Sequence, residues 1–99
     1  MIRSDDGVLR VEGPVTFANV EAVLAEGQRM FDRSLVRVDL QGVTEVDSSA
    51  LSMLLEWARQ TAGKGWRIEF LNLPPNLNSL AMLYGVTELI PVASPDASR

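Results

Sequence analysis

Asp47, Ser48 and Ser49 are the residues whose types and spacing are best suited to chemistry in this sequence. They follow a short turn at residues 43–46 and open a helical pattern that runs to about Ala62. Asp and Ser accept hydrogen bonds from the N–H groups of a first helical turn, so one of these side chains is expected to cap the helix. One cap needs only one side chain, and a serine hydroxyl at a helix N-terminus is a favourable place for a phosphate. The cluster is therefore a candidate regulatory site.

Other kinds of chemistry lack the residues they need. The chain has no His and no Cys, which excludes Ser–His–Asp and Cys–His catalysis, zinc sites built on His or Cys, and disulfides. Glu45 and Asp47 could form a carboxylate pair, but a domain of this size has little depth in which to tune them, and solvated turn acids are the better interpretation. Gly63-Lys64-Gly65 lacks the spacing of a phosphate-binding loop and is typical of a helix end. We expect no catalytic residue, no metal and no cofactor.

The length and net charge of the chain further restrict its domain number and the classes of partner it can bind. The chain has 99 residues, 46% of them hydrophobic, and a net charge of −4. Such a length supports one domain, which we assign to residues 1–92, with a short flexible C-terminal tail at 93–99. The negative charge argues against unaided binding to nucleic acid or anionic lipid. The most apolar run, residues 50–58, is too short to span a bilayer. We expect a soluble, cytoplasmic protein that does not insert directly into a membrane.

The elements that must position the cluster alternate between strands and helices. Strand patterns occur at 8–12, 35–40 and 66–71, and a short edge strand is expected within 86–92. Helical patterns begin at Phe17, with Gly27 as a weak point, at the Asp47 cluster, and at Pro75, where the apolar stripe ends with Tyr84. This order predicts an α/β domain with one small sheet and its helices packed against it. The strands at 35–40 and 66–71 should be parallel, with a right-handed crossover.

The helix after the cluster has two apolar sides. At 100° per residue its main stripe contains Leu51, Leu54, Leu55, Ala58 and Ala62, and should pack on the sheet. Met53 and Trp57 lie nearly opposite, one turn apart. Another helix could cover them; if they are exposed, they form a protein-binding patch, since Trp and Met are enriched in interface cores. We predict that Met53 and Trp57 face outward and bind a partner.

At these residues the chain resembles the STAS domain family, named for sulfate transporters and anti-sigma-factor antagonists. Residues 36–40 resemble the family's central strand with its Asp, and residues 46–51 resemble the signature Asp-Ser/Thr-x-Gly-Leu at the head of the second helix. Ala50 stands where Gly is usual. In the anti-sigma-factor antagonists the first Ser after that Asp is phosphorylated, so the resemblance implies Ser48 as the possible phosphoacceptor, with Asp47 and Ser49 supporting the motif.

Two stretches, 50–57 and 72–86, are most similar to the STAS subunit of the Mla phospholipid-transport ABC complex of Gram-negative bacteria. This resemblance implies a non-enzymatic cytoplasmic subunit, held at the inner membrane by its partner. It would bind and support the ATPase subunit of a transporter that maintains outer-membrane lipid asymmetry. The alternative is an anti-sigma-factor antagonist that binds a kinase-type anti-sigma factor and is switched off by a phosphate on Ser48.

Overall fold

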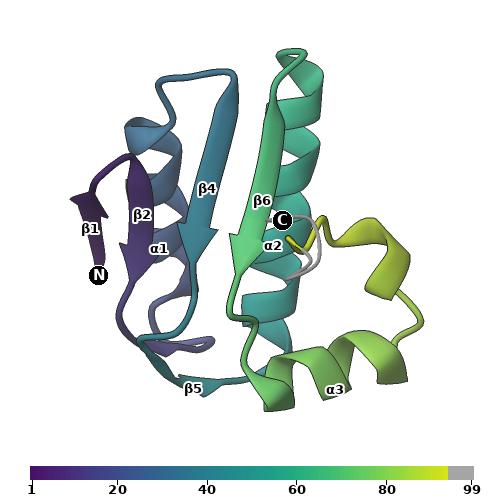
Figure 1. Cartoon of the computed structure of the whole chain (residues 1–99). Coiled ribbons are helices and arrows are strands. Elements are labelled where there is room, and N and C mark those ends of the chain that lie inside the picture. The colour runs from purple at the N-terminus through teal and green to yellow at the C-terminus, as the bar shows by residue number, and fades with distance from the viewer. Residues whose placement is uncertain (94–99) are drawn as a thin grey trace.

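Four strands form the main sheet, in the order β1-β2-β4-β6, in a computed structural model that describes residues 1–93 (Figure 1). Strand β1 is antiparallel to β2, whereas β2, β4 and β6 are mutually parallel. The predicted parallel pairing of the segments at 35–40 and 66–71 is confirmed. The strands span Ile2–Asp5 (β1), Val8–Val11 (β2), Leu35–Asp39 (β4) and Arg67–Leu71 (β6).

The two longer helices cover one face of this sheet, and a third helix crosses below its carboxyl end (Figure 1). They are α1 (Val20–Met30), α2 (Ser48–Gly63) and α3 (Pro75–Leu83). Two short strands, β3 (Gly13–Val15) and β5 (Val43–Val46), pair separately in parallel. The α/β architecture with helices packed on one small mixed sheet is as predicted. Within residues 1–93, no helix is both long and apolar enough to cross a membrane.

Alternation along the strands separates a buried face from a charged face. Residues of β2, β4 and β6 that point toward the helices are buried, because side chains of a strand point alternately to the two faces of its sheet. The opposite face carries ion pairs, such as Arg37 with Glu69 at 3.4 Å. The buried set is Leu9, Val11, Val36, Val38, Ile68 and Phe70.

Several elements differ from the sequence-based prediction. The segment at 43–46, expected to be a turn, is strand β5, and it pairs with β3, which was not predicted as a strand. Strand β1 was not expected in a polar segment; it forms because a turn with positive φ at Asp6 and Gly7 folds it back on β2 as a hairpin edge. Helix α1 begins at Val20 instead of Phe17. The preceding turn is closed by Asn19, whose side-chain oxygen accepts from the Thr16 N–H at 2.9 Å.

The predicted edge strand at 86–92 also differs from the structure. The segment forms a 3-10 turn, η1 (Thr87–Leu89), and keeps only one strand-like bridge, between Val92 and Phe70. Pro91 has no N–H to donate to a ladder, which limits the pairing. Residues 94–99, most of the predicted tail, lie outside the described residues.

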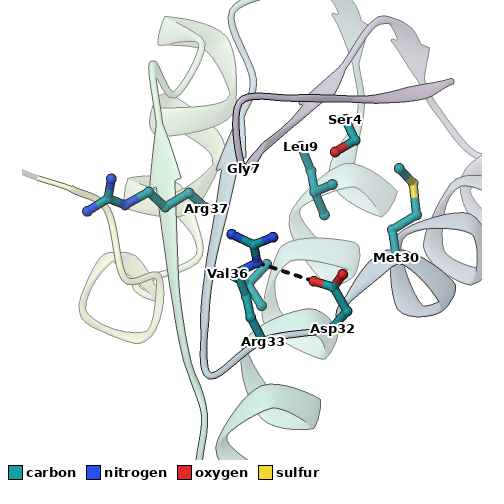
Figure 2. Close-up of a pocket in the computed structure, with 8 residues that line it drawn as sticks. All are labelled: Ser4, Gly7, Leu9, Met30, Asp32, Arg33, Val36 and Arg37. Carbon is teal, nitrogen blue, oxygen red and sulfur yellow. Dashed lines mark hydrogen bonds and ion pairs between the residues drawn. The ribbon is translucent and has the colours of Figure 1, made fainter.

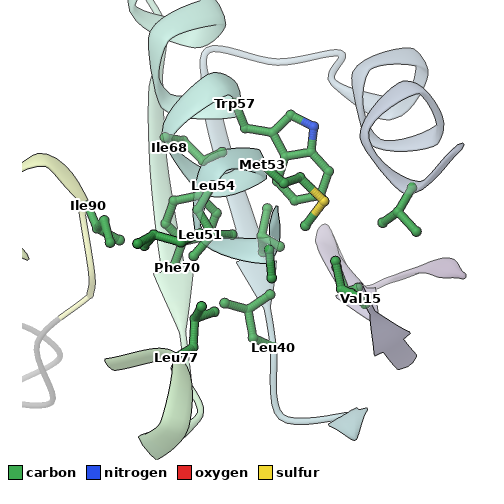
Figure 3. Packing of buried hydrophobic residues seen from close by; sticks show 14 of the residues in the cluster. Val15, Leu40, Leu51, Met53, Leu54, Trp57, Ile68, Phe70, Leu77 and Ile90 are labelled. Atoms are coloured by element: carbon green, nitrogen blue, oxygen red, sulfur yellow. The ribbon is translucent and has the colours of Figure 1, made fainter. Parts of the chain in front are cut away.

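The prediction that Met53 and Trp57 face outward is wrong. Met53 is 3% exposed and Trp57 is completely buried. Helix α1 lies beside α2 on the same face of the sheet, and Figure 3 shows the Trp57 indole on the α1 side of α2. The ring also packs edge-on against Phe31, with centroids 5.7 Å apart. The pair is part of the core between two helices and forms no surface patch.

Gly27 is what allows this packing. The Trp57 indole N–H donates to the Leu24 carbonyl of α1 at 3.1 Å, and the ring lies directly over Gly27. A Cβ at Gly27 would lie 2.4 Å from the Trp57 Cζ2 atom, which is closer than two non-bonded carbon atoms can approach. The glycine that weakens α1 by propensity is therefore required by the ring that crosses it.

Replacing Gly27 with Ala should destabilise the fold, although Ala is the better helix former. An overpacked core typically costs about 1–3 kcal/mol. Gly63→Ala is the matched control, because a Cβ at Gly63 has no neighbour within 4 Å. It should change the free energy of unfolding by no more than about 1 kcal/mol, toward greater stability. Urea denaturation followed by circular dichroism measures both. A Gly27→Ala protein as stable as the wild type would contradict the packing.

The burial of Trp57 can be tested by fluorescence. With Trp66→Phe, the single remaining Trp57 should emit in the blue, resist acrylamide quenching, and shift to the red only on unfolding. With Trp57→Phe, the half-buried Trp66 should be quenched more readily. Equal quenching of the two tryptophans in the folded protein would show that the α1–α2 contact is open.

Candidate functional site

Asp47 is the N-cap of helix α2 and fixes the start of the helix in space. Its Oδ1 accepts from the Ser49 N–H at 2.9 Å and from the Ser49 hydroxyl. Its Oδ2 accepts at 3.0 Å from the N–H of Phe17, in the loop between β3 and α1. One carboxylate therefore caps α2 and ties a second segment, thirty residues away in sequence, to the same corner.

The three residues of the cluster have different roles. Asp47 and Ser49 are used in the cap, whereas Ser48 is exposed at the first position of the helix. Within residues 1–93, no hydrogen bond involves the Ser48 hydroxyl; the Ser48 carbonyl accepts one from Ser52 at 3.4 Å. Ser48 is thus the member of the cluster that can meet a partner or a phosphate donor. The Ala50 methyl is buried and does not obstruct this surface.

A groove of about 300 Å³ begins at Ser48 and runs between α2 and the end of α3. At the other side of the corner, Phe17 is 84% exposed while its backbone is held by Asp47. The groove and Phe17 together make one surface around the helix start, which we call the Ser48 surface. It comprises Phe17, Ser48, Leu51, Ser52, Leu55, Tyr84 and Val86.

Tyr84 lies at this surface and is not buried. The sequence pattern had instead placed it on the apolar stripe of the third helix. Helix α3 ends at Leu83, so Tyr84 is its C-cap and is 57% exposed. Met82 and Leu83, in the last turn, are also exposed. Three large apolar side chains in succession at the surface are unusual away from an interface. The sequence signal was Gly85, which ends the helix before Tyr84 can be buried.

Asp39 positions α3 relative to this corner. It lies at the end of β4 and is 5% exposed. Its Oδ1 accepts from the Gln41 N–H at 2.9 Å and from the Asn72 side chain at 3.1 Å, and its Oδ2 pairs with Arg10. Asn72 has a positive φ of 55° in the loop that leads to α3. A buried carboxylate with three partners therefore holds the loop that delivers Tyr84.

A second hollow lies at the opposite end of the sheet, between the β1–β2 turn and the loop after α1. It has a volume of about 240 Å³ and an apolar floor that includes Leu9 and Met30. Figure 2 shows the Arg33 side chain directed to Asp32, at 3.3 Å, and Arg37 pointing away. In this hollow Asp32 and Arg33 form an exposed ion pair, so the charged side chains do not point together toward a bound group. Among residues 1–93, no three His, Cys, Asp or Glu side chains are grouped to hold a metal ion.

The hydrogen bonds at the corner lower the pKa of Asp47. The Ser49 hydroxyl has the largest effect, followed by the Phe17 N–H, because both donate to the ionised carboxylate. A carboxyl with a lowered pKa in the folded state adds stability above its unfolded pKa, near 3.8, and loses it as the pH falls through the folded value. The corner is thus stabilised at neutral pH and weakened by acid.

Acid titration of the unfolding free energy tests this arrangement. Between about pH 5 and pH 2, the wild type should lose more stability than Asp47→Asn, which retains a cap but has no charge to protonate. The Ser49→Ala protein should lose less stability than the wild type over the same pH range, because the substitution removes the donor with the largest effect on the Asp47 pKa. Parallel pH profiles for wild type and Asp47→Asn would show that these hydrogen bonds do not form in solution.

Comparison with known proteins identifies the fold and the family. Residues 2–91 match the family model described as "Mlab, STAS domain". Among curated protein sequences, none matches this chain.

Solved structures give the same result at the level of the fold. The anti-sigma factor antagonist SpoIIAA in its unphosphorylated form superposes with a TM-score of 0.71 at 16% identity, over 99% of this chain and 90% of its own. The Bacillus cell fate determinant SpoIIAA in its phosphorylated form gives 0.67 at 16% identity, over 99% and 94%. Part of a third structure, Mglu, gives 0.58 at 22% identity, over 76% of this chain and 19% of its own. With its sequence match, its mixed sheet and its exposed serine at the head of α2, this chain belongs to the STAS domain family, in the MlaB-like group.

Proposed function

We propose that this chain is a non-enzymatic STAS subunit that binds the ATPase of a phospholipid-transporting ABC complex of the Mla type. The observation that carries the proposal is the match of residues 2–91 to the MlaB-like family model. The chemistry of the Ser48 surface agrees with a binding role, since it consists of apolar side chains around a serine. The protein would be cytoplasmic, attached to the inner membrane through its partner.

The ATPase would bind at the Ser48 surface. Ser48 and Ser52 supply hydroxyl groups beside a groove whose other walls, Leu55, Tyr84 and Val86, are apolar. Aromatic and aliphatic groups at the centre of an interface supply most of its binding energy, and a few polar groups fix the orientation. This surface replaces the patch of Met53 and Trp57, which the core has buried.

The second candidate is an anti-sigma-factor antagonist switched by phosphorylation of Ser48. It is favoured by the likeness of the fold to SpoIIAA, which was solved in unphosphorylated and phosphorylated forms. Ser48 is exposed at a helix N-terminus, where the helix dipole favours negative charge. However, the family model that residues 2–91 match is the MlaB-like one. We therefore favour the transporter subunit.

Co-purification distinguishes the two functions. The chain should form a stable complex with the ATPase subunit of the phospholipid transporter encoded in the same genome. Ser48→Leu should weaken that complex by roughly tenfold, about 1.4 kcal/mol, because it replaces a central hydroxyl with a bulkier side chain. Ser34→Leu, an exposed serine at the opposite end of the sheet, is the control and should bind normally.

Two results would overturn the proposal. One is a complex that is equally stable with Ser48→Leu and Ser48→Asp, which would place the interface elsewhere. The other is the absence of any ATPase complex together with ATP-dependent phosphorylation of Ser48 by a kinase-type anti-sigma factor, which would establish the antagonist function instead.

A further inference from the structure

The sequence segments that supply the side chains of the Ser48 surface contain no Lys or Arg. No Lys or Arg occurs in residues 11–28, 38–58 or 68–93. These three segments supply β3, β5, α3, η1, the first half of α2 and most of α1. Every side chain of the Ser48 surface therefore comes from a part of the sequence without cations.

Acidic side chains of the same segments are exposed. Glu21 lies in the first turn of α1, Glu45 in β5 two residues before Asp47, and Glu88 in η1 two residues after Val86. All three are exposed, and none forms an ion pair within residues 1–93. The elements around the groove thus carry negative charge that the fold itself does not neutralise.

The open face of the sheet shows the opposite arrangement. There Glu12 pairs with Arg3 at 3.1 Å, Asp5 with Arg10 at 3.2 Å, and Glu69 with Arg37 at 3.4 Å. Acids on that face are matched by arginines of the neighbouring strands. Four exposed acids within residues 1–93 lack an ion pair: Glu21, Glu45 and Glu88 lie in the elements around the Ser48 surface, and the fourth, Asp6, lies in the β1–β2 turn.

Two of the residues of the Ser48 surface are exposed aromatic rings. Phe17 projects from a loop whose backbone is fixed by Asp47, and Tyr84 borders the groove. Rings held by an ordered backbone lose little conformational freedom on binding, so they make good anchors. An apolar centre with a charged border is the usual form of a protein interface.

We infer that the Ser48 surface docks a protein surface whose centre is apolar and whose border carries Arg or Lys side chains. The inference rests on the proposed function and specifies the chemistry of the ATPase surface. Glu45, Glu21 and Glu88 attract the basic border, while Phe17 and Tyr84 contact the apolar centre. Charges at the border of an interface chiefly raise the association rate, and salt screens their effect.

The test measures association of the chain with the purified ATPase subunit at two ionic strengths. At about 0.1 M salt, Glu45→Lys should slow association by roughly tenfold, and at about 1 M salt the difference should nearly vanish, because the Debye length falls from about 10 Å to about 3 Å. Asp32→Lys changes the net charge equally at the opposite end of the sheet and is the control. It should leave the association rate within about twofold of wild type.

The aromatic anchors have a separate test. Phe17→Ala should raise the dissociation constant by roughly tenfold or more at both salt concentrations, since an apolar contact is not screened. Leu89→Ala removes an exposed apolar side chain from a different groove, beside β6, and should have little effect.

The outcomes separate this inference from the function on which it rests. Binding that is weakened by Ser48→Leu but insensitive to salt, Glu45→Lys and Phe17→Ala would overturn the inference and leave the transporter function standing. Faster association of Glu45→Lys would show that the partner surface is acidic and would also overturn it. Failure of the wild-type chain to bind the ATPase at either salt concentration would overturn both.

Discussion

The contact between Trp57 and Gly27 is the constraint on which the arrangement of the helices depends. A bulky indole on α2 reaches the backbone of α1 only because the facing residue has no side chain, and its N–H is then satisfied by the Leu24 carbonyl. Since α1 and α2 cover the same face of the sheet, this contact sets how closely they lie. The distance between the two helices in turn positions the loop before α1 next to the start of α2, and Asp47 hydrogen-bonds both segments.

Two carboxylates convert this packing into a defined surface. Asp47 joins the Phe17 loop to the first turn of α2, and Asp39 joins the ends of β2 and β4 to the loop before α3. Each lies at the carboxyl end of the sheet, where open α/β folds place their functional sites. Because both carboxylates accept several hydrogen bonds, they orient the flanking segments, and Ser48, next to Asp47, is left exposed.

The resulting surface is suited to recognition. It has hydroxyl groups, aromatic rings and a shallow apolar groove, and the elements around it carry unpaired acids. A protein partner can cover such a surface and gain from burying its apolar part, while the charges direct the approach. The STAS fold carries more than one function, so the partner is decided by these side chains and not by the topology.

The sequence by itself determined the α/β class, the strands at 8–12, 35–40 and 66–71 with the parallel pairing of the last two, a helix cap within the Asp47 cluster, and the family, because each depends on local periodicity, element order or a short motif. It also indicated Ser48 as a regulatory residue, because the chain has no His or Cys with which a serine could form a catalytic group. It did not determine which side of α2 was exposed: the same pattern of Met53 and Trp57 fits a surface patch or a contact between helices, and only the position of α1 decided it. Phe17 and Tyr84 were assigned to helices by the same periodicity. The tertiary structure placed them outside, because the Asp47 hydrogen bond and the Asn19 turn hold Phe17 ahead of α1, and α3 ends one residue before Tyr84.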